Sequence, residues 1–140
     1  MFYTYEITVP ANTAKRSPRE DVVKLTAGVI TRVSYRPRPG HAALCHCQVL
    51  YHEHQITPTN PDGELHGDTF PIESDEFLEL DSIPYDLKIV SWNDDDTYDH
   101  TFDISFTVLP RAAVFVLALV DFINNLAGIF SPRRIFGGGG

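Results

Sequence analysis

The feature that most constrains this chain is a long apolar segment that follows Pro110. Residues 111–130 read RAAVFVLALVDFINNLAGIF, and apolar residues occupy nearly every position without alternating. This pattern predicts an α-helix rather than a strand. Such a helix left in water is an aggregation hazard. We therefore expect it to be buried against other copies of the chain, another protein or a membrane, which favours assembly over catalysis.

The few polar residues of the predicted helix fall on one narrow stripe. Asp121, Asn124, Asn125 and Gly128 are spaced i, i+3, i+4 and i+7, which places them on one side of a helix. The stripe favours a helical bundle or a partner groove, where Asp and Asn find partners across a symmetry axis. The predicted assembly positions are Val114, Leu117, Val120, Asp121, Ile123, Asn124, Asn125 and Ile129.

Two other placements of this helix stay open. At about 1.5 Å per residue, residues 112–130 would span about 28 Å, which nearly crosses a bilayer. An Asp and two Asn near the middle are costly in lipid, so a membrane span is less favoured. The helix could also pack back on its own domain. Residues 132–140 include Arg133-Arg134 and four glycines, and we expect a flexible basic tail there.

Residues 1–110 show the alternation that is typical of short antiparallel strands. Turn signals separate them, and no helical periodicity appears before residue 111. The predicted class is mainly β: an antiparallel β-sandwich or jelly roll at 1–110, followed by an assembly helix at 111–131. The predicted strands are 2–9, 22–26, 29–35, 43–51, 52–56, 69–72, 76–80, 85–92 and 100–109.

Charge is unevenly distributed along the chain. Residues 1–40 carry a net charge of +4, residues 41–110 carry −14 and residues 111–140 carry +2, within a total of −8. This asymmetry suits head-to-tail contact between like subunits, unless folding brings the opposite charges side by side. An acidic chain of this kind is a poor nucleic-acid binder.

The two cysteines and the first residues bear on the compartment. Cys45 and Cys47 are two apart in a predicted strand and share a face. An extended strand holds them too far apart for a mutual disulfide, so we expect free buried thiols. The chain opens directly into strand-like sequence without the pattern of a signal peptide. We expect a protein made in the cytoplasm and carried in a virion or another large assembly.

Two clusters are candidate metal sites. Asp94, Asp95, Asp96 and Asp99 lie in an acidic segment predicted as a hairpin loop, and their hard oxygens suit Ca²⁺. A solvated loop is the competing interpretation. His46, His52 and His54 could supply zinc ligands, with His52 and His54 on one strand face. Exposed or structural histidines are the alternative.

Catalysis has little support in the sequence. We find no G-x-S-x-G, H-E-x-x-H, P-loop or dinucleotide fingerprint, and we expect neither catalytic residues nor a required cofactor. Trp92 and Tyr98, with the loop at 57–67, could form a sugar-binding surface, because aromatic faces stack on sugars. Alternatively, Trp92 anchors the sandwich core.

Three stretches, at 7–13, 58–63 and 92–100, resemble a group of small β-sandwich proteins of phages and environmental bacteria. The resemblance covers about residues 5–110. It implies a compact sandwich on the outside of an assembly, such as a capsid decoration or spike, and brings no catalytic residues. The sequence thus predicts a non-enzymatic structural subunit, with a glycan-binding module or a tail-anchored membrane protein as alternatives.

Overall fold

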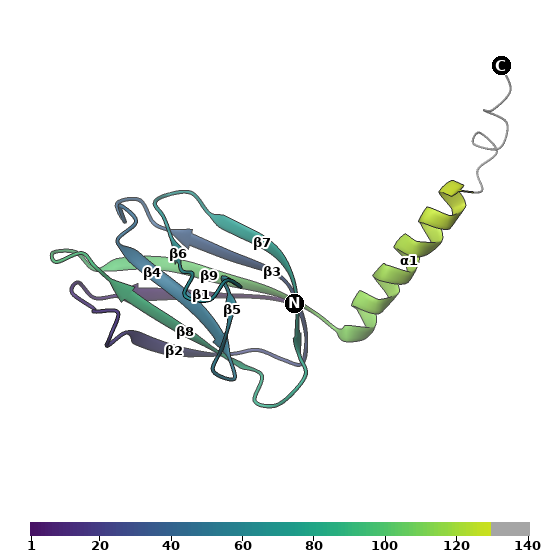
Figure 1. Ribbon diagram of the computed structural model, residues 1–140, viewed down its shortest axis with the longest axis horizontal. Helices are drawn as coiled ribbons and strands as arrows, with labels where there is room; N and C mark the ends of the chain where they lie inside the picture. The colour runs from purple at the N-terminus through teal and green to yellow at the C-terminus, as the bar shows by residue number, and fades with distance from the viewer. Residues whose placement is uncertain (130–140) are drawn as a thin grey trace, which may run out of the picture.

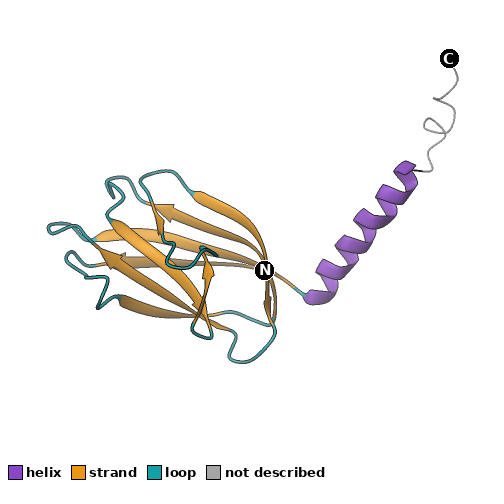
Figure 2. Cartoon of the chain, in the orientation of Figure 1, coloured by secondary structure: helices purple, strands orange, loops and turns teal. Residues whose placement is uncertain are grey.

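The computed structural model describes residues 1–129, which form nine strands and one helix. Figures 1 and 2 show two layers of strands, with the helix leaving one end of the sandwich and pointing away from it. The predicted β-sandwich with a C-terminal helix is confirmed. The elements are β1 (Phe2–Val9), β2 (Arg19–Lys24), β3 (Gly28–Pro37), β4 (Cys45–Tyr51), β5 (His54–Thr57), β6 (Leu65–His66), β7 (Ile72–Leu80), β8 (Asp86–Asn93), β9 (His100–Leu109) and α1 (Arg111–Ile129).

The strands pair in the order of a jelly roll. One sheet has the order β1-β9-β3-β7 and the other β2-β8-β4-β5, with the short β6 added to β4. Apart from β6, the first strand pairs with the last, β2 with β8, β3 with β7 and β4 with β5, all antiparallel. The chain is therefore one long hairpin rolled up into two sheets, which is the eight-strand jelly-roll arrangement.

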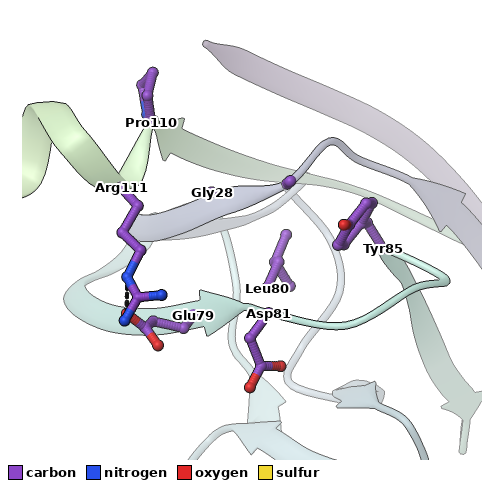
Figure 3. Close-up of a pocket in the computed structure, with 8 residues that line it drawn as sticks. Gly28, Glu79, Leu80, Asp81, Tyr85, Pro110 and Arg111 are labelled. Carbon is purple, nitrogen blue, oxygen red and sulfur yellow. Dashed lines mark ion pairs between the residues drawn. The ribbon is translucent and has the colours of Figure 1, made fainter.

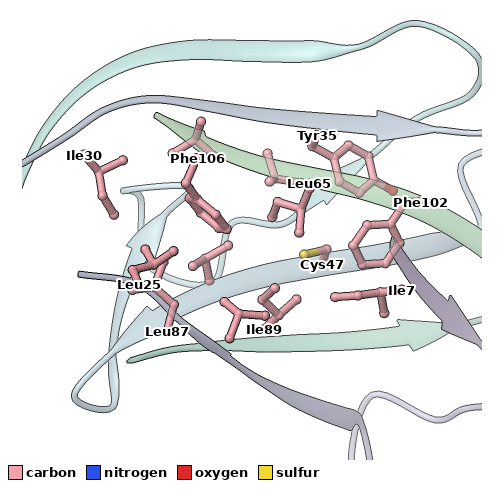
Figure 4. Packing of buried hydrophobic residues seen from close by; sticks show 14 of the residues in the cluster. Ile7, Leu25, Ile30, Tyr35, Cys47, Leu65, Leu87, Ile89, Phe102 and Phe106 are labelled. Carbon is pink, nitrogen blue, oxygen red and sulfur yellow. The ribbon is translucent and has the colours of Figure 1, made fainter. Parts of the chain in front are cut away.

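The core lies between the two sheets and consists of alternate side chains. On β9 the even-numbered residues from Phe102 to Val108 are fully buried, whereas the odd-numbered ones are half-buried. Leu87 and Ile89 of β8 face them from the other sheet (Figure 4). Each large apolar side chain buried in this way contributes about 1.5–3 kcal/mol. All the buried core residues in the described part of the chain precede α1, so the sandwich is complete without the helix.

Several predicted strand boundaries are confirmed, and the prediction of two separate strands between residues 69 and 80 is wrong. The strands at 2–9 and 100–109 lie where the alternation predicts them. Residues 69–71 of the predicted strand at 69–72 lie outside any strand, and one strand, β7, runs from Ile72 to Leu80 and continues through Glu73, Ser74 and Asp75. These polar residues suit a strand at the edge of its sheet, and the ion pair between Arg32 Nε and Asp75 Oδ1 at 2.9 Å joins them to β3.

Two connections between consecutive strands cross from one sheet to the other. The acidic segment after β8 is not a hairpin loop, because β8 pairs with β2 and β4 while β9 pairs with β1 and β3. The turn before Gly28 likewise leads from β2 in one sheet to β3 in the other. Rolling the hairpin separates neighbours in sequence into different layers, which strand alternation alone does not reveal.

The segment at 52–56 begins with a tight turn. His52 and Glu53 have φ angles of 46° and 65°, and Tyr51 pairs with His54 across the hairpin. Two central residues with positive φ define a type I′ turn, whose twist matches a two-residue hairpin. His52 therefore lies in the turn and His54 in β5, and the prediction that they share one strand face is wrong.

Candidate functional site

Helix α1 follows the sandwich directly after Pro110, and an ion pair links its first turn to the edge of one sheet. The carbonyl of Pro110 accepts hydrogen bonds from the backbone N–H groups of Ala113 and Val114 at 3.0 and 3.2 Å, which begin the helix. Arg111 Nε lies 3.2 Å from Glu79 Oε1 on the edge strand β7. The predicted helix start at residue 111 agrees with the structure. The predicted end at residue 131 and the tail at 132–140 lie outside the described residues.

None of the side chains of α1 is buried. Of the predicted assembly positions, Val114 at the root is half-buried. Leu117, Val120, Ile123 and Ile129 are between 46% and 56% exposed. Asp121, Asn124 and Asn125 are also exposed. Packing of the helix against its own domain, one of the three placements considered from the sequence, is not seen in the described residues.

A small pocket lies at the root of α1 (Figure 3). Its volume is about 290 Å³, and Glu79, Asp81, Tyr85 and Arg111 contribute its polar groups. Gly28 forms part of its wall, and a Cβ atom built there would lie 2.6 Å from the carbonyl oxygen of Leu109. The backbone of β3 therefore passes close to the end of β9, immediately before the chain enters the helix.

Trp92 does not offer a free ring face. It is 2% exposed, although its side chain belongs to the outer side of its sheet, opposite His46 on β4. The His46 ring stacks on it at 5.3 Å with an interplanar angle of 9°, and Lys15 Nζ lies 4.9 Å from the ring centroid. Tyr98 is 69% exposed. The sugar platform predicted from these two residues therefore has only Tyr98 available.

The four aspartates of the acidic segment are directed to different partners. Asp95 Oδ1 accepts the N–H groups of Thr97 and Tyr98 at 2.8 and 3.2 Å, and these bonds lower the pKa of Asp95. Its Oδ2 lies 2.9 Å from His100 Nε2.

The other three aspartates likewise have partners of their own within the protein. Asp94 contacts His46, Asp96 accepts the Thr97 hydroxyl, and Asp99 accepts the N–H of Ala11. Within residues 1–129, no group of three or more His, Cys, Asp or Glu side chains is placed so that it could hold a metal ion. The convergence of the four aspartates that a Ca²⁺ site requires is therefore not seen.

A buried histidine pair was missed by sequence reasoning. His41 and His100 are 1% and 6% exposed, and their ring centroids are 4.6 Å apart. His41 Nε2 lies 2.8 Å from the carbonyl oxygen of Thr101 and therefore donates to it, while its Nδ1 has no partner in the described residues. Burial lowers the pKa of His41. The two histidines are far apart in sequence, so only the jelly-roll topology brings them together.

The two cysteines are free and buried, as predicted. Burial raises the pKa of the Cys45 thiol to about 12 and that of Cys47 well above its usual value. The thiolate is the reactive form of cysteine, so both side chains are chemically quiet.

The uneven charge along the sequence is partly neutralised within the fold. Basic residues of the first forty pair with acidic residues from the segment 41–110: Arg32 with Asp75, Arg38 with Asp103, and Lys15 with Glu64. These pairs agree with the alternative that folding brings the opposite charges side by side. They weaken the case for head-to-tail contact through two separate charged faces.

Comparisons with family models, with curated proteins and with solved structures found no match to this chain. The functional argument therefore rests on the geometry of the described residues, and α1 is the feature of that geometry that most requires a partner.

Proposed function

We propose that this protein is a non-enzymatic structural subunit of a multi-subunit assembly, and that its copies associate through α1. The observation that carries the proposal is the exposure of this helix. Nine of its large apolar side chains are between 39% and 69% exposed. Contiguous apolar surface of this extent marks an interaction site on a soluble domain.

Burial of this helix would supply substantial association energy. Fully burying a large apolar side chain is worth about 1.5–3 kcal/mol, and the nine side chains still expose roughly half of their surface, so covering them gives a gross term on the order of 10 kcal/mol. Lost translational and rotational freedom and side-chain ordering oppose association by about 4–15 kcal/mol. The two terms are of similar size, so association through α1 requires most of its apolar surface to be covered.

The assembly that we propose is a virion, with the sandwich displayed outward as a capsid decoration or spike. Jelly rolls are frequent in viral capsid domains, and also in lectins and cupins. A fold alone does not define a function, so the helix and the resemblance noted for residues 5–110 supply the other support. A net charge of −8 suits a domain that keeps particles dispersed. The partners are other copies of this chain or another structural protein of the particle.

A carbohydrate-binding module receives less support from the geometry. Stacking on a sugar requires an open aromatic face, and His46 and Lys15 cover the ring of Trp92. Tyr98 alone gives a single aromatic contact on an exposed loop. We therefore retain self-association as the function that the described residues favour.

The mass of the full chain tests self-association directly. We expect light scattering on a sizing column in mild detergent to give a discrete oligomer for the full chain. A 1–110 truncation should be a folded monomer under the same conditions, because no core residue lies in α1. A monomeric full chain in detergent, or a 1–110 fragment with the same oligomeric mass, would contradict the proposal.

Outward display on a particle needs a separate test. Antibodies raised against the 1–110 fragment should label the surface of intact particles in negative-stain micrographs. Labelling seen only after particles are broken would contradict the outward position of the sandwich.

A further inference from the structure

The apolar surface of α1 runs around most of its circumference. At about 100° per residue, Asp121, Asn124, Asn125 and Gly128 occupy an arc of about 100°. The rest of the circumference is apolar and exposed, with Leu119, Ile123 and Leu126 near the side opposite the stripe. In the first half of the helix, the positions in line with the stripe are also apolar, because Val114 and Leu117 occupy them. Thus α1 is apolar all round for two turns and has one polar line thereafter.

A bundle of these helices standing in water does not cover such a surface. A helix of a soluble bundle buries an apolar stripe about 100° wide or somewhat wider and presents polar residues on the other side. Helix α1 has the reverse distribution. If its polar stripe faces other copies, the wide apolar arc faces outward, and that arc needs an apolar medium. If the stripe faces water, the arc has to be enclosed by protein on nearly every side.

A lipid bilayer is such an apolar medium, and the length of α1 matches the thickness of its hydrocarbon core. Its nineteen residues span about 28 Å at 1.5 Å per residue, against about 30 Å for the hydrocarbon core of a bilayer. It is the one helix in the described residues that is long and apolar enough to cross a membrane. A buried core helix would meet the same criterion, but none of α1 is buried.

We infer that α1 crosses a lipid bilayer, with Leu119 and its neighbours facing the lipid. The inference of a membrane span rests on the length of the helix and on the apolar residues around most of its circumference. The direction of the stripe rests on the proposed function: within the bilayer, Asp121, Asn124 and Asn125 face the α1 helices of other copies. Polar groups in a membrane segment face the bundle interior, where partners lower their cost.

Two further details of the helix fit this arrangement. Gly128 lies on the stripe, and among the described residues a Cβ atom built there meets nothing within 4 Å apart from its own turn of the helix. A small residue at this position allows helices to approach closely, as is usual at membrane helix interfaces. Arg111 lies at the helix start, beside Glu79 of the sandwich, where a basic side chain can remain at the membrane surface.

Flotation of the full chain with vesicles tests the span. The probe is vesicles of phosphatidylcholine with phosphatidylglycerol, formed with the full chain as detergent is removed and then centrifuged through a density gradient. We expect the protein to float with the vesicles and to resist extraction by high salt or alkaline carbonate. A full chain that forms a discrete soluble oligomer without detergent and stays at the bottom of the gradient would overturn the inference.

Lipid quenching then locates the face that meets the lipid. Three variants, Leu119→Cys, Asn124→Cys and Val22→Cys, each introduce one exposed cysteine that carries a fluorophore. The native Cys45 and Cys47 are buried and stay unlabelled. Positions 119 and 124 lie about 140° apart around the helix. Val22 lies on β2 of the sandwich and is 61% exposed, so it serves as the matched control.

The three positions separate failure of the span from failure of self-association. Brominated phosphatidylcholine should quench the label at 119 severalfold more than the labels at 124 and 22. Equal quenching at 119 and 124, with none at 22, would support the span and contradict association through the stripe. Quenching at 119 no stronger than at 22 would overturn the span. Trp92 fluorescence, from the single tryptophan of the chain, reports whether each variant keeps its folded sandwich.

Discussion

Arg111 Nε lies 3.2 Å from Glu79 Oε1, and this ion pair links the first turn of α1 to the edge strand β7. The two side chains are 79% and 36% exposed. Water screens a pair of this kind, and exposed pairs contribute about 0.2–1 kcal/mol. The link orients the root of the helix and adds little to the stability of the sandwich.

We therefore predict that Arg111→Ala lowers the free energy of unfolding by less than about 1 kcal/mol. Urea denaturation followed by Trp92 fluorescence measures this change. A double-mutant cycle with Glu79→Gln isolates the pair itself. A coupling energy above about 2 kcal/mol would show that the helix root is held far more firmly than one exposed pair allows.

The close approach at Gly28 predicts a larger effect. In Gly28→Ala, the new Cβ atom would lie 2.6 Å from the Leu109 carbonyl oxygen and 2.9 Å from Val108 Cγ1, at a φ of +155°. Added volume in a packed site costs about 1–3 kcal/mol, and we expect a loss of that size in urea denaturation. Gly67→Ala is the control, because its Cβ atom meets only Pro37 at 3.8 Å and should be nearly neutral. Equal effects of the two substitutions would contradict the close approach.

The buried imidazole of His41 predicts a loss of stability in mild acid. Burial lowers the pKa of His41, whereas an unfolded histidine titrates at about 6.5. Above that pH both states hold a neutral ring. As the pH falls through 6.5 toward the lower folded pKa, the unfolded state takes up the proton first, so folding becomes less favourable. The slope from one such proton is at most about 1.4 kcal/mol per pH unit.

Two neighbours modify this titration: the charge of His100 opposes protonation of His41, and the Asp68 carboxylate favours it. Unfolding free energies at pH 7, 6 and 5 should fall more steeply in the wild type than in His41→Gln, even where that variant is less stable throughout. His54→Gln, in an exposed position on β5, is the control and should keep the wild-type slope. If the unfolding free energy of His41→Gln fell with pH as steeply as that of the wild type, His41 would not be the cause of the loss.

The polar stripe predicts a change of assembly without a change of fold. Replacing both Asn124 and Asn125 with Leu removes the amide partners that specify how copies meet, since a polar residue at a helix interface sets register and oligomer number. We expect an altered oligomer mass by light scattering in detergent. The unfolding midpoint reported by Trp92 should stay within about 2 °C of wild type, because no core residue lies in α1. Unfolding of residues 1–110 in this variant would contradict the modular arrangement.

The alternation of apolar and polar residues predicted the position of a strand correctly where one face of that strand is buried. β1 and β9 lie where the sequence predicts them because their apolar residues alternate without interruption. β7 was divided into two because Glu73, Ser74 and Asp75 resemble a turn. A strand at the edge of a sheet tolerates such residues, and the ladder with β3 keeps them extended. That ladder is a long-range contact, which a local pattern does not contain.

The same limit applies to the side-chain clusters. Periodicity identified the exposed stripe on α1, because a helix face is a local property. It did not identify the pairing of His41 with His100, or the cover that His46 and Lys15 give Trp92. Those contacts arise from the rolling of the hairpin, which brings together residues that are distant in sequence. Sequence reasoning therefore located the helix better than the surroundings of any residue in the sandwich.

Disulfide cross-linking within vesicles tests the central claim most directly, that copies of the chain meet through the polar stripe of α1. The full chain carries Asn124→Cys or, as the matched control, Leu119→Cys on the far side of the helix. The native thiols are buried and should not react. Mild oxidation should yield a covalent dimer in high yield from Asn124→Cys and little from Leu119→Cys. Equal yields, or a higher yield from Leu119→Cys, would contradict the account.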